Sequence, residues 1–352
     1  MSLEPSATGD DFYAKLPKVE LHRHLEGSLR VKTMMEVVRA HDLDVKDTGY
    51  LRPLVQVERD RDYTFENFLA KFGTLRLFYK SPGIIKRITK EAIEDAAADN
   101  IWYMELRFTP VALSQAEAFP IAEVIDWVIE SVQEAEEVLD IQVRLIVSIN
   151  RHESVSLAEE VIQLAVDRVQ KGIVGIDLAG NEAEYAAGPF QTLFAEAQQE
   201  GLRITIHAGE WGGPENVREA IQVLGADRIG HGVRVLEDPD VVRLAVERRV
   251  PFEVCVTSNH HSGVVEDIET HPLSKMLLEG LNVTINTDDP SISKITLGHE
   301  YRTVTETLGL PLWVLRERVL AAVRASFLPS RNRQQLAYEI SEAFSMVMID
   351  HE

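Results

Sequence analysis

Apolar positions in the middle of the chain follow helical and strand periods in turn. Between residues 84 and 96 they recur at helical spacing, which predicts an amphipathic helix that ends near Asn100. Ser81 is suited to the N-cap of this helix and Pro82 to its first position. The run 101–107 follows directly and predicts a strand.

The same helix–strand unit recurs along the chain. Further helices are predicted over residues 120–139, 157–170, 189–200 and 272–279, and a helical tail starts at Leu297. Gly172, Gly201 and Gly280 end three of these helices, because glycine readily takes the left-handed conformation that stops a helix. The eight predicted strands cover residues 19–24, 101–107, 141–149, 173–178, 202–207, 228–231, 251–256 and 281–287.

These eight strands indicate the α/β class and a closed (β/α)8 TIM barrel. Several of them, such as residues 173–178, are continuous apolar runs, which is typical of a parallel sheet buried on both faces. Fewer units would favour an open doubly wound sheet. No GxGxxG motif follows the first strand, which argues against a dinucleotide-binding fold.

The domain organisation follows from the absence of any linker or low-complexity segment. Residues 11–350 are predicted to form one barrel domain, and residues 1–10 a disordered tail. The long stretch from Gly27 to Asn100 predicts extra helices between the first two strands, over the barrel mouth. The tail from Leu297 is expected to pack against the outside of the barrel.

One segment within the long stretch has a strongly apolar helical face. Phe65, Phe68, Leu69 and Phe72 are spaced i, i+3, i+4 and i+7. Packing in the core is the simpler interpretation and the one we favour. The alternative is an apolar gate over a substrate.

Charge and cysteine content narrow the classes of partner. The 352-residue chain has a net charge of -21, which disfavours nucleic acid and suits a small neutral or cationic substrate. Cys255 is the one cysteine, so no intramolecular disulfide is possible. The first residues do not resemble a signal peptide, and no apolar run reaches the roughly 18 residues that span a bilayer. We therefore expect a cytoplasmic protein with no membrane partner.

Candidate chemistry gathers at the predicted strand ends, where barrel enzymes place their active sites. His22 and His24 are two residues apart on one strand, so they point to the same face. His207 and Asp288 end two other strands and complete a His3Asp set, which suits one catalytic Zn²⁺ per chain with room for a water. Any one of these histidines alone would more simply be a core or surface residue. Their joint placement favours the metal site.

Other zinc chemistries are excluded by the residues present. The HxE and PCxxC site of cytidine-type deaminases needs two cysteines, and HExxH is absent. No lysine near Asp177 is available to bridge two metals, which favours a single ion. Arg107 is expected to support the site from behind or to pair with Glu105. Ser258 and Asn259 are expected either to support the metal site or to cap a loop.

An ordered set of motifs resembles the adenosine deaminase family of metal-dependent amidohydrolases. The matching stretches are residues 16–27, 104–110, 177–182, 206–210, 228–232 and 286–290. The resemblance implies zinc ligation by His22, His24, His207 and Asp288. It also implies that Glu210 donates a proton to purine N1 and that His231 orients and deprotonates the zinc-bound water.

The same resemblance implies the substrate contacts. His24 and Glu26 fall at substrate-binding positions, with Glu26 near the ribose 5′ hydroxyl. Asp289 corresponds to a residue that hydrogen-bonds N7, and the Gly180 backbone to a contact with N3.

Two residues depart from the usual family pattern. Glu26 stands where many members have aspartate, and Asn181 replaces another frequent aspartate. Residues 286–293 nevertheless resemble the nucleoside enzymes. We therefore expect deamination of adenosine and 2′-deoxyadenosine to inosine and 2′-deoxyinosine, with release of ammonia. A modified adenine nucleoside such as aminofutalosine ranks second, and free adenine third.

Two functions of other classes compete with deamination. A non-deaminating zinc hydrolase would use the same metal but would not need Glu210 and Asp289 together. A non-enzymatic metal-binding protein would need no acid beside the metal. The expected partner is thus a small-molecule purine nucleoside.

Overall fold

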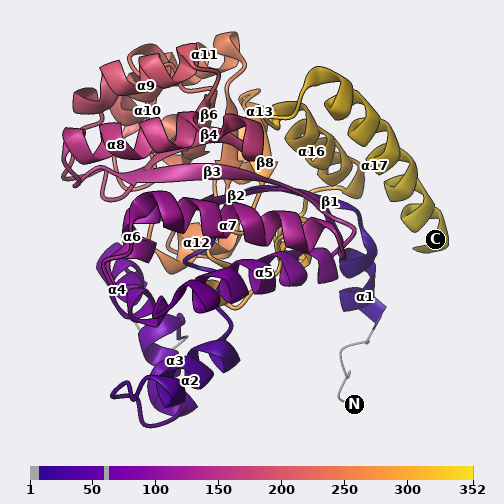
Figure 1. The fold of residues 1–352 in the computed structure, drawn as a ribbon. Coiled ribbons are helices and arrows are strands. Elements are labelled where there is room, and N and C mark those ends of the chain that lie inside the picture. The colour runs from indigo at the N-terminus through magenta and orange to yellow at the C-terminus, as the bar shows by residue number, and fades with distance from the viewer. Residues whose placement is uncertain (1–7, 59–62, 352) are drawn as a thin grey trace.

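The computed structural model describes residues 8–58 and 63–351 and shows one sheet of eight parallel strands (Figure 1). The strands pair in sequence order from first to last, as a barrel requires. They are β1 (Lys18–His24), β2 (Ile101–Phe108), β3 (Gln142–Asn150), β4 (Ile173–Ala179), β5 (Arg203–Ala208), β6 (Arg228–His231), β7 (Pro251–Val254) and β8 (Asn282–Ile285). The predicted (β/α)8 barrel is confirmed.

The outer layer is a helix after each strand, with further helices inserted. The barrel helices are α5 (Pro82–Ala98), α7 (Ile121–Glu136), α8 (Val155–Val166), α9 (Gln191–Gln199), α10 (Pro214–Gln222), α11 (Pro239–Arg248), α13 (Leu273–Leu278) and α16 (Leu312–Ala325). The remaining helices are α1 (Thr8–Lys15), α2 (Val31–Ala40), α3 (Thr48–Val55), α4 (Phe65–Leu75), α6 (Pro110–Ser114), α12 (Val256–His261), α14 (Pro290–Ser293), α15 (Leu297–Arg302) and α17 (Ser330–His351). Short single turns are η1 (Arg76–Phe78), η2 (Val169–Lys171), η3 (Gly188–Phe190), η4 (Val233–Glu237), η5 (Ile268–Thr270) and the π turn η6 (Thr303–Thr307).

The expected additions to the barrel are present. Helices α2 to α4 lie between β1 and β2 in sequence and group together at one side of the molecule (Figure 1). Helix α16 packs on β8 and β1, and α17 lies along α16 on the outside. Helix α1 begins at Thr8, so the last three residues of the predicted tail 1–10 are helical, and residues 1–7 lie outside the described residues. No helix in the described part of the chain is long and apolar enough to cross a membrane.

Local sequence signals explain several element ends. The Ser81 hydroxyl accepts the Ile84 N–H at 3.2 Å, so the predicted N-cap of α5 is confirmed. Gly172, Gly201 and Gly280 have φ values of 108°, 94° and 83°, the left-handed conformation expected before a strand. The predicted helix 157–170 instead ends at Val166 and continues as the turn η2.

Two strands end earlier than the apolar pattern predicts. Strand β7 ends at Val254, and Val256 begins α12, because the buried Glu300 carboxylate accepts the Thr257 N–H and hydroxyl there. Strand β8 ends at Ile285, and after it side chains, not backbone groups, bond the end of β8 to β1. Asn286 accepts the Leu21 N–H at 2.9 Å, and Glu20 accepts the Thr287 N–H at 3.1 Å.

The barrel closes between its first and last strands through these contacts and one isolated bridge. Arg23 and Asp288 form that bridge. The Asp288 N–H donates to the His22 carbonyl at 2.9 Å, and the His24 N–H donates to the Asp288 carbonyl at 2.8 Å. The closing seam therefore runs through three of the predicted zinc ligands.

Candidate active site

A cavity of about 390 Å³ opens at the carboxyl ends of the strands. This volume is in the usual range for a small-molecule site. It is lined by a polar group of side chains and by an apolar wall from α4. The polar group includes His24, Glu26, His207, Glu210, His231, Asp288 and Asp289, and the wall includes Phe68, Leu69 and Phe72. Phe68 belongs to the hydrophobic core and Phe72 packs against it, as we favoured, and together with Leu69 they also line the cavity.

The four predicted metal ligands meet at the floor of this cavity. His22, His24, His207 and Asp288 each offer a ligand atom, and these atoms lie within 4.8 Å of one another. Asp288 Oδ1 is 3.3 Å from Nε2 of both His22 and His24, and the Nε2 atoms of His24 and His207 are also 3.3 Å apart. The spacing places three imidazoles and one carboxylate around a single point.

Hydrogen bonds behind the cluster orient its ligand atoms. His22 Nδ1 lies 2.7 Å from a Glu253 carboxylate oxygen, and His207 Nδ1 lies 2.9 Å from an Asp177 oxygen. A carboxylate can only accept, so each ring is protonated at Nδ1 and turns the Nε2 lone pair to the cluster. Buried His22 Nε2 has no hydrogen-bond partner among the described residues. A metal ion would supply the missing partner, so the residues fit one.

The carboxylate ligand is oriented in a similar way. The Ser258 hydroxyl donates to Asp288 Oδ2 at 2.6 Å, which leaves Oδ1 facing the histidines. Ser258 therefore supports the metal site, and the loop-capping alternative is not needed. Asp288 itself has a φ of 65°, a strained conformation for a residue with a side chain. Strain of this kind is common where a side chain must reach one fixed point.

Glu210 stands beside the cluster as a buried acid. Its Oε2 atom is 3.6 Å from His231 Nε2. Burial raises the pKa of Glu210 well above its ordinary value, and the charges of Asp288 and Glu182 add to the rise. A carboxyl held protonated near neutral pH can donate a proton.

Glu182 holds the loop that carries Glu210. Its carboxylate accepts three consecutive backbone N–H groups, from Gly209 at 3.0 Å, Glu210 at 2.7 Å and Trp211 at 2.8 Å. Glu182 ends the stretch 177–182 that resembles the family, but the sequence predicts no role for it. A buried carboxylate that binds successive backbone amides leaves no signal in the local spacing, because its partners lie on another loop.

A directed chain of hydrogen bonds sets the tautomer of His231. The Leu273 N–H donates to His271 Nδ1 at 3.1 Å, so His271 carries its proton on Nε2 and donates to Asn259 Oδ1 at 3.2 Å. The Asn259 amide nitrogen, 3.1 Å from His231 Nδ1, is then the donor of that pair. Neutral His231 consequently bears its proton on Nε2, toward Glu210 and Asp288.

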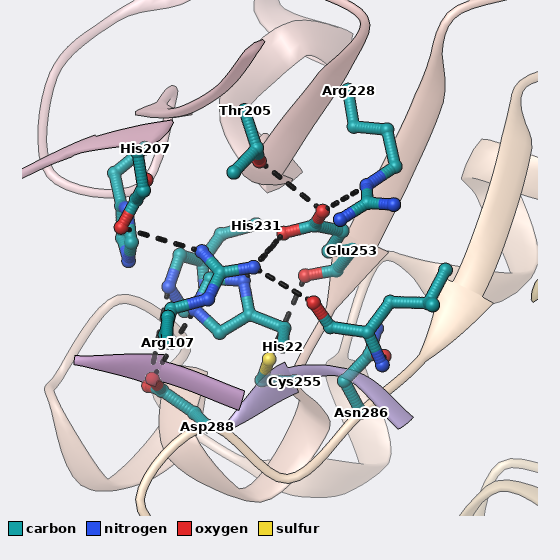
Figure 2. A network of polar contacts seen from close by, with 12 residues as sticks. His22, Arg107, Thr205, His207, Arg228, His231, Glu253, Cys255, Asn286 and Asp288 are labelled. Carbon is teal, nitrogen blue, oxygen red and sulfur yellow. Dashed lines mark hydrogen bonds and ion pairs between the residues drawn. The ribbon is translucent and has the colours of Figure 1, made fainter. Parts of the chain in front are cut away.

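Below the cluster, charged groups fill part of the barrel interior (Figure 2). Glu253 Oε2 binds Arg107 at 2.7 Å as well as His22, and Glu253 Oε1 binds Arg228 at 2.5 Å and Thr205 at 3.1 Å. Arg107 therefore supports the site from behind. The alternative pair of Arg107 with Glu105 is not found, because Glu105 binds Arg228 at 2.5 Å instead.

The remaining predicted contacts also line the cavity. Gly180 has a φ of 91°, so its backbone faces the cavity without a side chain. Glu26 accepts the Thr109 N–H at 2.6 Å through Oε1, whereas its buried Oε2 has no partner among the described residues. Asp289 Oδ1 is also buried and has no hydrogen-bond partner among the described residues. All nine predicted site residues thus surround one cavity or its floor.

Comparison with known proteins places this site in a family. A family model described as adenosine deaminase matches residues 17–343. A curated adenosine deaminase of Clostridium botulinum strain Langeland is 37% identical over 331 residues, which cover 94% of this chain and 98% of the relative.

Solved structures agree with the sequence match. The adenine deaminase of Arthrobacter aurescens superimposes with a TM-score of 0.86 at 27% identity and covers 93% of this chain and 98% of its own. Arabidopsis ADAL in complex with IMP gives a TM-score of 0.85 at 27% identity, with 96% and 99% covered.

Proposed function

Because the chain belongs to the adenosine deaminase family, we propose that it converts adenosine and 2′-deoxyadenosine to inosine and 2′-deoxyinosine with one zinc ion per chain. The observation that carries this proposal is the His3Asp cluster beside the buried carboxyl of Glu210 in one cavity. A hydrolase without deaminase activity would not need that acid.

His22, His24, His207 and Asp288 would hold the ion, since their ligand atoms already converge. Zinc bound to such a site lowers the pKa of water from 15.7 to about 7 and so supplies hydroxide at neutral pH. Three histidines and one carboxylate with an open side match the ligand preference of catalytic zinc.

Glu210 supplies the proton that the reaction requires. Attack at C6 breaks the conjugation of the purine and pushes electrons onto N1. A proton delivered to N1 removes that charge, and the raised pKa of Glu210 keeps the proton available. The ammonia that leaves converts the 6-amino purine into the 6-oxo purine.

His231 and Asp289 complete the set by hydrogen bonding. The Nε2–H of His231 is directed to orient the attacking water, and the chain through Asn259 favours this orienting role. Burial and the neighbouring carboxylates Asp288, Glu26 and Glu210 raise the pKa of Asp289 well above its ordinary value. Protonated Asp289 can donate to purine N7, which only accepts. The Gly180 backbone and Glu26 would contact N3 and the sugar.

The proposal is tested by ammonia release from purified, zinc-loaded protein. The panel is adenosine, 2′-deoxyadenosine, adenine and aminofutalosine. We expect the two nucleosides to be the best substrates by kcat/KM. Preference for adenine would favour the third-ranked candidate. The similarity to the Arthrobacter adenine deaminase and the longer Glu26 side chain support that candidate. No ammonia from any of the four would overturn the deaminase assignment.

The support of Asp288 by Ser258 gives a prediction for the metal. Ser258→Ala removes the hydroxyl that fixes Asp288 Oδ2, so we expect zinc affinity to fall by about 10- to 100-fold, the usual effect of losing such a partner. Competition with a chromophoric chelator measures the change. Ser131→Ala is the matched control, because Ser131 is a buried serine that bonds only the Trp127 carbonyl, on α7. Equal zinc affinities in the two variants would contradict the role given to Ser258.

A further inference from the structure

The substrate cavity has a cationic corner that deamination of a neutral nucleoside does not use. Among the described residues that line the cavity, Arg76 is the only arginine or lysine. It begins η1, directly after the apolar wall of α4, and its side chain is half-buried. Its guanidinium makes no hydrogen bond or ion pair with any described residue.

The groups around Arg76 are also left with free hydrogen-bonding atoms. Glu26 Oε2 and the Tyr79 hydroxyl are buried and have no partner in the described part of the chain. Glu26 and Arg76 line the same cavity, and no hydrogen bond or ion pair joins them. Buried polar atoms are normally satisfied, so the free oxygen of Glu26, which lines the same cavity as Arg76, indicates a polar ligand there.

The direction of the substrate follows from its chemistry. The amino group leaves from C6, which must face Glu210 and the metal cluster. In a purine nucleoside the sugar is attached at N9, at the opposite end of the ring system. The sugar and any group attached to it therefore point away from the cluster. Polar residues of the cavity lining outside the cluster include Glu26, Arg76, Asn150, His152 and Asn181, and Arg76 is the one among them with a guanidinium group.

We propose that the cavity accepts adenine nucleosides with an anionic group on the sugar, and that Arg76 binds that group. This inference rests on the proposed deaminase function and names its substrate class. A guanidinium presents parallel donors that match a carboxylate or phosphate, and such charge-assisted pairs are the stronger hydrogen bonds. The chain has a net charge of -21, which repels anions at a distance, so a local cation is needed to bind one.

The experiment compares neutral and anionic substrates in wild type and variants. The substrates are adenosine and 5′-deoxyadenosine, which are neutral, and AMP and adenosine 5′-carboxylate, which are anionic. We expect Arg76→Ala to lower kcat/KM by about 10- to 100-fold on the preferred anion, mainly through KM, with less than about a 3-fold change for adenosine. Arg76→Lys restores part of the loss, since it keeps the charge without the planar fork.

Arg39→Ala is the matched control, because Arg39 is an exposed arginine at the end of α2 and the substitution changes the net charge equally. It should leave all four substrates unchanged. Preference for AMP would show that Arg76 binds a phosphate group. Preference for adenosine 5′-carboxylate would show that it binds a carboxylate. Equal losses on adenosine and on the anions in Arg76→Ala would overturn the proposal. So would turnover of adenosine with neither anion accepted.

Binding separates this inference from the proposed function. Titration calorimetry with AMP and adenosine 5′-carboxylate measures affinity without turnover. If no nucleoside is deaminated but one of the anions binds and loses affinity in Arg76→Ala, the anion-binding role of Arg76 is supported and the deaminase assignment is wrong. In the opposite case, the nucleosides are deaminated while Arg76→Ala binds both anions as tightly as wild type does. That result would overturn the anionic substrate class and leave the deaminase function in place.

Discussion

Glu210→Gln is expected to lower kcat on adenosine by at least about 100-fold while one zinc per chain is retained. The amide has the size of the carboxyl group but cannot give up a proton, so the charge on N1 is no longer removed. The ligand atoms are untouched, because none of them belongs to Glu210. Steady-state ammonia release and elemental analysis of the same preparation measure the two quantities.

A charge-matched control separates the loss of the Glu210 proton from the loss of one negative charge. Glu200→Gln removes one negative charge at the exposed end of α9 and should keep wild-type turnover. If Glu210→Gln turns over adenosine at a near-normal rate, Glu210 is not the acid of the reaction. If the variant instead loses zinc, the cluster depends on Glu210 in a way that its geometry does not show.

Glu253→Gln is expected to give the largest loss of stability. One carboxylate here faces two buried guanidinium groups, Arg107 and Arg228, and an imidazole of the metal cluster. Although burial alone would raise its pKa, the charges of Arg107 and Arg228 hold the pKa of Glu253 well below its usual range. Removing the anion deprives both buried guanidinium groups of the carboxylate they share and leaves Arg228 with Glu105 and Arg107 with Asp177. We therefore expect the free energy of unfolding to fall by about 3–5 kcal/mol.

Urea denaturation of the zinc-free protein measures this change without a contribution from the metal. Glu237→Gln is the comparison, since Glu237 forms a similar bidentate pair with Arg234 at the surface. Exposed pairs contribute roughly 0–1 kcal/mol, so that variant should remain close to wild type. A loss below about 1 kcal/mol in Glu253→Gln would show that the buried network does not depend on its central anion.

The barrel and the convergence of the four candidate ligands were predictable from sequence because both follow short-range rules. Helix, glycine and strand repeat in order, and His22 and His24 share a face by the period of the strand alone. Strand ends converge in any barrel, so His207 and Asp288 could be assigned to the same site without a structure. Residues from distant parts of the chain meet because the fold, once recognised, fixes where strand ends lie.

The support beneath the site was not predictable in the same way. Glu253 lies within β7 and is fully buried, and nothing in the sequence near it indicates that it bonds to four other strands. Arg107 had a suitable partner two residues away in Glu105, yet the structure pairs it across the barrel. Such pairings depend on side-chain directions inside a closed barrel, which periodicity does not give.

The apolar face of α4 illustrates a second limit. A stripe of Phe and Leu predicts burial, and it does so equally well for a core and for the wall of a ligand cavity. In the structure the face of α4 does both, because Phe68 is part of the core and also lines the cavity.

The seam of the barrel has a consequence for biosynthesis. His22 and His24 lie in the first strand, while Asp288 follows the last, and their backbones bond directly to each other. A nascent chain can therefore offer only part of the ligand set until almost all of it has left the ribosome. A metal ion held by these residues would be acquired by a finished barrel and would join its first strand to its last, so that loss of the ion would loosen the whole barrel and not one loop.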